Sequence, residues 1–488
     1  MESQNAKLAQ SSIGLLGLVM ISMAGVLPII GPMEVAAFIG SAGPAAIWPV
    51  IVGFVLFLIV SLPILEYTKI TPFAGGYYGL AELGFGKAAG KYTAITNYVF
   101  YLLWQTTNGF AMPAILMNTL YLLYGIVLPI WAWLLLALLV LVVTNASAAI
   151  HVKHLSRILI VITVITLLIV VSYTLYVIAR SPYNSLYYLN PANSYSGFTG
   201  IALGTAIYGF FLYVGYGTTL FYSEEAKQGR KDVWRSVYLS LGISAIAIAL
   251  AAYSEVISVP LSDLSTVANS TLPQMVTWIH YLPASALLGL NVLVVIISMV
   301  SFSAGGGAQS RLLWSMARDN FINVKWLGKL NKNRVPINAI LLQFFVSLAI
   351  ILTVAGLLVH FYGYNIDTVT TAWFLGGSAG TIIWYFHHFI PEFGLYSYLR
   401  KHKEVNYSAF RRLVIGLIIP LLGTALFIYT FYDGIISDLV EPYFAFVIAD
   451  AVILVALLLF VYYKARKNAL GESVVNYMAA ELGKEKTN

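Results

Sequence analysis

Long apolar stretches recur from one end of this sequence to the other, and each has the length that a helix needs to cross a bilayer, roughly 20 residues. Only 10% of the residues are charged, against about 25% in soluble proteins. The sequence therefore predicts an all-α integral membrane protein embedded in a lipid bilayer. Twelve transmembrane spans are predicted, at residues 12–40, 44–68, 92–125, 127–148, 155–179, 197–222, 236–258, 284–315, 336–360, 367–390, 412–432 and 442–463.

The basic residues fall almost entirely on one side of these spans. If the N-terminus lies in the cytoplasm, Arg180 is the only one of 27 Lys and Arg residues on the outer side. Because positively charged loops stay in the cytoplasm, both termini are predicted to be cytoplasmic, in a multi-pass protein of the plasma membrane. The formal net charge of +7 then belongs to the inner membrane surface, and no nucleic-acid partner is needed to explain it. No cleavable leader is expected, because polar residues 1–10 lead directly into a full-length span.

The composition argues against catalytic and metal chemistry. The chain has no cysteine, which excludes disulfides, thiol catalysis and cysteine-based metal sites. The seven histidines are scattered, and their one adjacent pair, His387-His388, stands at the predicted end of the tenth span. No acidic, His or Cys cluster has catalytic or ligand spacing. We therefore expect neither an enzyme nor a metal site, and no cofactor beyond a coupling ion, H⁺ or Na⁺.

The sixth predicted span is interrupted near its middle. Apolar and aromatic residues 207–214 are followed by Gly215-Tyr216-Gly217-Thr218-Thr219, and glycine is unfavourable inside a helix because it loses the most backbone freedom on ordering. In lipid, backbone outside the helical ladder is tolerated only where it is buried in protein or lines a cavity. The interruption indicates either a binding site near the bilayer midplane or glycines packed against a neighbouring helix.

The first predicted span carries a similar interruption at residues 25–32, where two prolines are flanked by glycines. Proline inside a helix removes a hydrogen bond and clashes with the preceding turn. The sixth span follows the first by an odd number of crossings, so the two cross in opposite directions. This pattern is typical of inverted-topology halves with a site at their interface, although two coincidental kinks would look the same. The predicted division is a tail at residues 1–11, five-helix repeats at 12–180 and 197–390, two further helices at 411–463 and a tail at 464–488.

Three motifs in order resemble those of one transporter superfamily. Glu66 is followed by residues 71–77 (TPFAGGY), and the sixth span leads into residues 224–230 (EEAKQGR). The eighth span ends in residues 310–320 (SRLLWSMARDN), and Val335-Pro336 opens the ninth. Over most of its length the chain thus resembles the amino acid–polyamine–organocation (APC) superfamily of secondary transporters.

The resemblance implies a five-plus-five inverted repeat with discontinuous first and sixth helices, two peripheral helices, and alternating access. In such families the substrate carboxylate meets amides of the first helix and the ammonium meets carbonyls of the sixth, in keeping with the partial charges at helix ends. The expected function is secondary active transport of amino acids or closely related amines. The implied substrate-binding residues are Gly25, Val26, Leu27, Pro28, Ile29, Ile30, Gly31, Phe211, Leu212, Val214, Gly215 and Gly217.

The sequence departs from the family pattern at two positions. Pro32 stands where relatives supply an amide, and Gly217 stands where many relatives carry a glutamate. Phe211 occupies the position of an aromatic gate in exchanger relatives, or is an ordinary core or lipid-facing aromatic. Residues 224–225 and 311–334 are interpreted as gate and loop salt bridges rather than substrate ligands.

Several polar residues allow both a binding role and a packing role. Gln105 and Asn108 lie in the third span, which passes the site in this fold, and they either contact ligand or bond neighbouring helices. Hydroxyls on the eighth span either bind a sodium ion or pack between helices; they are Ser298, Ser301 and Ser303. Asp450 in the twelfth span is expected to serve a partner contact or a dimer seam.

The sequence does not decide whether the coupling ion is H⁺ or Na⁺. Proton-coupled relatives often carry a lysine in the fifth span, but residues 158–178 contain none, and Thr166 lies near that place. Glu34 could carry a proton, favour a cationic substrate, or bond a neighbouring helix. The alternatives to coupled transport are amino acid/polyamine exchange, uncoupled facilitation and, more remotely, a channel or membrane enzyme. The particular substrate, the direction of transport and the oligomeric state are not fixed by the sequence.

Overall fold

The computed structural model describes Leu8 and residues 12–70, 76–205, 209, 211–403, 405–432 and 441–475. Within these ranges the chain is helical and forms no strand, apart from an isolated bridge between Ile13 and Ala226. The α-helices are α1 (Leu15–Val26), α2 (Gly31–Ala42), α3 (Ile47–Ile70), α4 (Tyr77–Phe85), α5 (Lys87–Tyr124), α6 (Ile130–Ala148), α7 (Val152–Arg180), α8 (Phe198–Gly204), α9 (Gly229–Val256), α10 (Leu264–Ala268), α11 (Pro273–Thr277), α12 (Ala284–Ser301), α13 (Ser303–Arg318), α14 (Ile337–Tyr362), α15 (Ile366–Lys401), α16 (Ala409–Leu413), α17 (Ile419–Phe431) and α18 (Tyr443–Arg466). The 3₁₀ segments that matter below are η1 (Pro28–Ile30), η6 (Phe211–Tyr213) and η7 (Tyr216–Glu225), and η10 (Val414–Ile418) is a π-helical turn.

Nine helical stretches in the described part of the chain are long and apolar enough to cross a membrane. They coincide with nine of the predicted spans. They are Leu15–Ala45, Ile47–Ile70, Ile130–Ala148, Val152–Arg180, Lys231–Val256, Ala284–Arg318, Ile337–Tyr362, Ala409–Phe431 and Tyr443–Arg466. The chain is therefore an all-helical, multi-pass membrane protein.

Three predicted spans fall outside this set, for two physical reasons. The helices α5 and α15 are long, at 38 and 36 residues, but they bury polar side chains such as Gln105 and Glu392 against other helices. Those polar side chains lower the mean hydropathy of α5 and α15, so neither helix is as apolar as the nine stretches above. The sixth predicted span is broken, and no single helix covers it.

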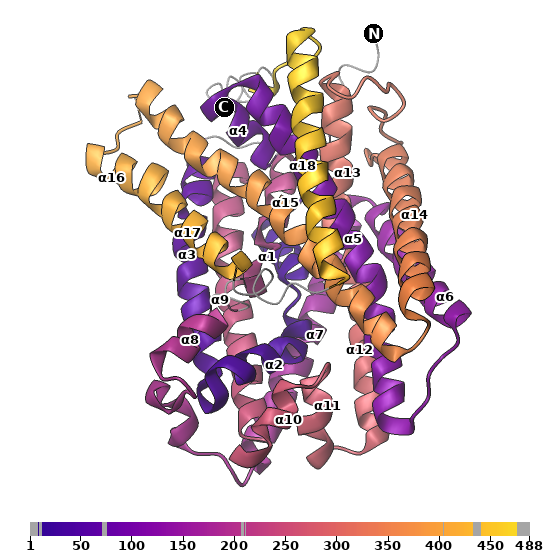
Figure 1. Cartoon of the computed structure of the whole chain (residues 1–488). Coiled ribbons are helices and arrows are strands. Elements are labelled where there is room, and N and C mark those ends of the chain that lie inside the picture. Colours follow the sequence, from indigo (N-terminus) through magenta and orange to yellow (C-terminus); the bar gives the residue numbers. More distant parts are fainter. Residues whose placement is uncertain are drawn as a thin grey trace.

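The interior is formed by helices from both halves of the sequence. The helix α15 packs along α5 and α4, while α1 packs against α9 and α7 (Figure 1). By contrast, α18 buries only Asp450, Leu454 and Val461 and lies on the outside of the bundle. In Figure 1 the helix α4 and the end of α18 lie at one end of the bundle, here called the α4 face. The helices α8, α10 and α11 lie at the opposite end, here called the α10 face.

The predicted end of the tenth span is wrong. The helix α15 continues past residue 390 to Lys401 and contains Pro391 in its interior. His387 and His388 are each 1% exposed and lie inside the helix rather than at its end. The polar residues that suggested a helix end are buried instead, because α4 and α5 cover this part of α15.

Candidate functional site

The first span is interrupted where the sequence predicted. Helix α1 ends at Val26, and Leu27 adopts a left-handed conformation with φ 57° and ψ 60°. Such a backbone is unfavourable for a residue with a side chain. One turn of 3₁₀ helix follows, and α2 begins at Gly31. The backbone between the two helices is therefore released from the regular ladder near the middle of the span.

The sixth span is interrupted over a longer stretch. Helix α8 ends at Gly204, and the chain from Phe211 onward is 3₁₀-helical, with Gly215 at φ 106° between η6 and η7. Long 3₁₀ stretches are uncommon because their hydrogen bonds are poor, and they often mark functional hinges. Residues 206–208 and 210 and the side chain of Phe211 lie outside the described part of the structure, so the gate predicted for Phe211 stays a prediction.

The two interruptions meet backbone to backbone. A Cβ added at Gly25 would collide with the carbonyl oxygen of Gly215, and a Cβ added at Gly215 would collide with that of Gly25. Only glycine allows this approach at both positions, and the positive φ of Gly215 independently favours glycine. The predicted carboxylate-binding and ammonium-binding segments are thus brought into direct contact.

The carbonyl groups of the sixth-span break are already bonded in this conformation. Gly215 O accepts hydrogen bonds from the Thr218 hydroxyl at 2.7 Å and the Thr218 amide at 3.0 Å. Tyr216 O accepts one from Ser22 Oγ at 3.0 Å, and Ser22 Oγ also lies 2.6 Å from Ser240 Oγ. The Thr218 hydroxyl therefore satisfies the Gly215 carbonyl at which we expect the substrate ammonium to bind.

Gly217 has a specific partner that the sequence did not predict. A Cβ at Gly217 would collide with the hydroxyl of Tyr77, the first residue of α4. The Tyr77 ring packs on Phe221 and on both His387 and His388, with centroid distances of 6.2, 5.4 and 5.2 Å. The tyrosine hydroxyl thus occupies the space beside Gly217, where many APC relatives carry a glutamate.

The other predicted site residues are buried but do not all approach the break. Gln105 Oε1 accepts a hydrogen bond from Ser347 Oγ of α14 at 3.3 Å, so its side chain is directed toward α14. The side-chain nitrogen of Asn108, Nδ2, has no hydrogen-bond partner in the described part of the chain. Ser298 and Ser301 are almost fully buried, and Ser303, at the start of α13, donates a hydrogen bond to the carbonyl of Val300 in α12. Ligand or ion contacts at these residues stay predictions.

The two residues considered for coupling lie on different helices. Thr166 is 3% exposed on α7, which packs against α1 and α9. Glu34 lies in the first turn of α2, on the α10 side of the break, and is only partly buried. Within the described ranges no hydrogen bond or ion pair reaches its carboxylate. No polar contact therefore links the Glu34 carboxylate to the Gly25–Gly215 crossing in this part of the structure.

A buried ion pair joins the end of the sixth-span break to α13. Arg311 donates to both carboxylate oxygens of Glu225, at 2.8 and 2.9 Å, and its guanidinium lies 4.3 Å from the centre of the Tyr222 ring. The Arg311 and Glu225 side chains are 2% and 1% exposed. The predicted salt bridge between these two segments is present, and its role as a gate stays a prediction; the side chain of Glu224 lies outside the described part.

A second charged cluster lies at the end of α13. Asp319 accepts a hydrogen bond from the Tyr78 hydroxyl at 2.7 Å and pairs with Arg318 at 3.1 Å and Lys91 at 3.5 Å. On the neighbouring surface of α4, burial raises the pKa of the Glu82 carboxyl above its ordinary value. The helix α4, which belongs to neither interrupted span, is thereby fixed to α5 and to the end of α13.

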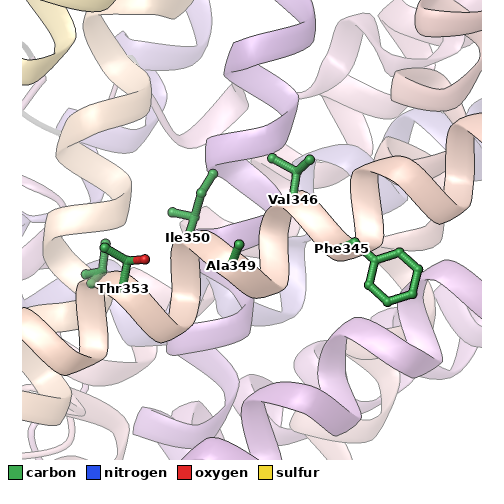
Figure 2. Close-up of a pocket in the computed structure, with 6 residues that line it drawn as sticks. Phe345, Val346, Ala349, Ile350 and Thr353 are labelled. Atoms are coloured by element: carbon green, nitrogen blue, oxygen red, sulfur yellow. The ribbon is translucent and has the colours of Figure 1, made fainter.

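An apolar groove of about 390 Å³ lies on the surface of α14, away from the two breaks. Figure 2 shows its side chains standing along one helix. They are Phe345, Val346, Ala349, Ile350, Thr353 and Val354. Binding sites for small polar molecules combine apolar walls with a few convergent polar groups, and this groove has one hydroxyl. We regard it as lipid-facing surface and not as a substrate site.

Interrupted membrane helices that meet at their breaks are typical of helical membrane transporters. Within that class the chain belongs to the amino acid permease family, whose model matches residues 17–473. This confirms the resemblance inferred from the motifs. The family and its relatives are permeases, so the expectation that the chain is not an enzyme is also confirmed.

Individual relatives are distant. The branched-chain amino acid permease BcaP of Lactococcus lactis is 26% identical over 410 residues, covering 80% of this chain and 82% of BcaP. An uncharacterised amino-acid permease of Schizosaccharomyces pombe is 24% identical over 351 residues, covering 69% of this chain and 62% of that protein.

Solved structures share the fold. A mutant of the manganese transporter of Eremococcus coleocola has a TM-score of 0.60 at 12% identity, covering 95% of this chain and 98% of its own. MhsT in complex with L-phenylalanine has a TM-score of 0.58 at 14% identity, covering 88% of this chain and all of its own. At these identities the likeness concerns the fold alone.

Proposed function

We propose that this permease is a secondary active transporter of amino acids that works by alternating access. The observation that carries the proposal is the contact between Gly25 and Gly215, because it joins two released backbone segments of opposite-running spans at one point. Backbone amides and carbonyls freed from helical bonding are the groups that bind the charged ends of an amino acid in such sites. The closed α4 face represents one of the two end states.

The proposal includes the architecture inferred from the sequence. Twelve spans result when α5, α15 and the interrupted segment 198–225 are added to the nine apolar ones. The first ten would form the inverted five-plus-five repeat, and α16–α17 and α18 the peripheral pair. The positive-inside rule supports placing the α4 face and both termini in the cytoplasm, in the plasma membrane.

The substrate proposal is an amino acid with an apolar side chain. The side chains of the first-span break are apolar; they are Val26, Leu27, Ile29 and Ile30. The name of BcaP specifies branched-chain amino acids for that relative. Branched-chain amino acids are therefore the first substrates to test, followed by other amino acids and amines.

Two measurements test the function. A thermal-shift screen against amino acids, polyamines and nucleobases should find a stabilising amino acid, because a ligand that binds only the folded state raises the melting temperature. Purified protein in liposomes should then show saturable uptake with counterflow of that amino acid. Saturable flux that never exceeds equilibrium, with any ion gradient, would favour exchange or facilitation over coupled transport. Absence of any amino acid binding and flux would refute the proposal.

A further inference from the structure

The helix α15 carries a buried imidazole–carboxylate pair that the substrate site does not use. His388 and Glu392 stand one helical turn apart, with 3.0 Å between His388 Nε2 and Glu392 Oε1. Their side chains are 1% and 0% exposed. Within the described ranges, no Lys or Arg lies within ion-pair distance of Glu392, and neither of its carboxyl oxygens has a hydrogen-bond partner. His388 is therefore the counter-group of a fully buried carboxyl.

The surroundings of the pair are aromatic. The Tyr216 hydroxyl lies 3.4 Å from His388 Nε2, and the Tyr77 ring lies 5.2 Å from the imidazole. Trp384 stacks on His388 at 4.5 Å and 19°. These contacts shield the pair from water on several sides at once.

Other titratable groups lie on the elements that pack around the pair. Tyr77 on α4 and Tyr216 on η7 interact electrostatically with Glu392, and His387 on α15 with His388. Phe100 of α5 packs on the His387 ring, and Phe57 of α3 packs on the Tyr216 ring. Gly423 of α17 lies against the Phe389 ring. The remaining acids on packed elements form no ion pair with either member of the pair in the described structure; they are Glu66 on α3, Glu82 on α4 and Asp450 on α18.

This environment makes the pair a one-proton site. With one shared proton the pair has no net charge, either as imidazolium and carboxylate or as imidazole and carboxylic acid. Without that proton it carries a net negative charge that no cation in the described structure balances. A lone buried charge is strongly disfavoured, so the proton should leave only when water reaches the pair.

The pair is mechanically joined to the substrate site and to the α4 face. Tyr216 directly follows Gly215, and Tyr77 touches both Gly217 and His388. A Cβ at Gly84 of α4 would collide with the backbone of Gly394, only two residues beyond Glu392, so α4 lies directly on this part of α15. Movement of α4 away from α15 would therefore open the α4 face and hydrate the pair together.

We propose that His388 and Glu392 form the proton-binding site that couples substrate transport to a proton gradient. The pair takes up one proton from water that enters from the α10 face while the α4 face is closed, and it releases that proton to water when α4 separates from α15. One N–H or O–H bond of the pair forms and later breaks, and no other covalent bond changes. This inference rests on the proposed function. It also assigns coupling to α15 rather than to Glu34, which is less buried than His388 and Glu392.

The test is substrate-driven proton flux into proteoliposomes that contain a pH-sensitive dye. The parent should acidify the interior during amino acid uptake. Glu392→Gln should reduce this flux at least tenfold while thermal shift still reports substrate binding, and His388→Gln provides a second variant if Glu392→Gln is unstable. Asp450→Asn is the matched control, since it removes another buried carboxyl, 2% exposed, on a peripheral helix.

The outcomes separate the inference from the proposed function. Parent-level proton flux in both Glu392→Gln and His388→Gln would overturn the inference, as would selective loss of flux in Glu34→Gln or Asp450→Asn. Substrate counterflow by the parent without any proton flux would overturn the inference and leave the transport function standing. A parent that neither binds nor moves amino acids would refute both.

Discussion

Removal of the Arg311 side chain should open the α4 face. In the closed conformation Glu225 is 1% exposed and receives both of its charged hydrogen bonds from Arg311. Breaking a buried ion pair by removing one partner costs about 3–5 kcal/mol, because the other charge stays buried without compensation. The cost disappears in any conformation in which water reaches Glu225. Arg311→Gln should therefore favour opening by about two to three and a half powers of ten, since each factor of ten corresponds to about 1.4 kcal/mol.

A single-cysteine reporter measures this shift, because the native chain has no cysteine. Ser223 is 7% exposed, its hydroxyl has no hydrogen-bond partner in the described structure, and it lies two residues before Glu225. Ser223→Cys is a near-isosteric change and should react slowly with a hydrophilic thiol reagent in the closed form. Adding Arg311→Gln should raise the labelling rate on the order of 100-fold, the lower end of the estimated shift.

Two comparisons make the result decisive. Arg411→Gln breaks an ion pair with Glu66 in which Arg411 is 49% exposed, and such pairs contribute only about 0–1 kcal/mol. Glu225→Gln combined with Arg311→Gln removes both charges and should return labelling toward the parent rate. If the Arg311→Gln reporter reacts no faster than the Arg411→Gln reporter, the Arg311 pair does not hold the face closed and the reasoning is refuted.

Three further predictions follow from the site and the fold. Gly215→Leu should reduce transport to background, because the new side chain would collide with the Gly25 carbonyl and because the backbone φ of 106° at this position favours glycine. Gly242→Leu is the control and should transport normally, because the space around Gly242 is open. Equal uptake by both variants would mean that the break at Gly215 serves only helix packing. In intact cells, Ser185→Cys should react with an impermeant thiol reagent and Asn331→Cys should not, and labelling of Asn331→Cys would reverse the proposed orientation. Because burial raises the pKa of Glu82 above 4.5, its carboxyl stabilises the folded state most below that pH, and this contribution is lost as the pH rises through the raised pKa. Thermal melting in detergent should therefore show a shallower decline with pH for Glu82→Gln than for the parent, and identical slopes would contradict the assignment.

The breaks could be predicted from sequence because their cause is local. Proline and paired glycines disfavour a helix wherever they occur, so residues 25–32 and the Gly215 region were identifiable without knowledge of the fold. The gate pair was identifiable from charges at the ends of apolar stretches. In each case a short segment determines the feature through its own backbone or charge.

The environment of α15 could not be predicted in this way. Pro391 and Glu392 read as the end of a span, because nothing in the local sequence shows that α4 covers them. The packing of Tyr77 against Gly217 joins positions that are 140 residues apart in the sequence. The local sequence therefore predicts a helix end at His387 and His388, although the environment of both residues depends on contacts that only the folded chain creates.

The bridge at the start of the chain has a practical consequence for handling the protein. The amides of Ser12 and Ile13 donate to the Glu225 carbonyl at 2.8 and 2.9 Å, and the Lys227 amide donates to Ile13 O at 2.8 Å. The segment at Ser12 and Ile13 is thereby hydrogen-bonded to the segment that carries Glu225. A bulky affinity tag joined directly ahead of Ser12 would pull on these bonds, so a long spacer is advisable. Conversely, an antibody fragment selected against the hydrogen-bonded segments at Ile13 and Ala226 should hold them in this conformation for imaging.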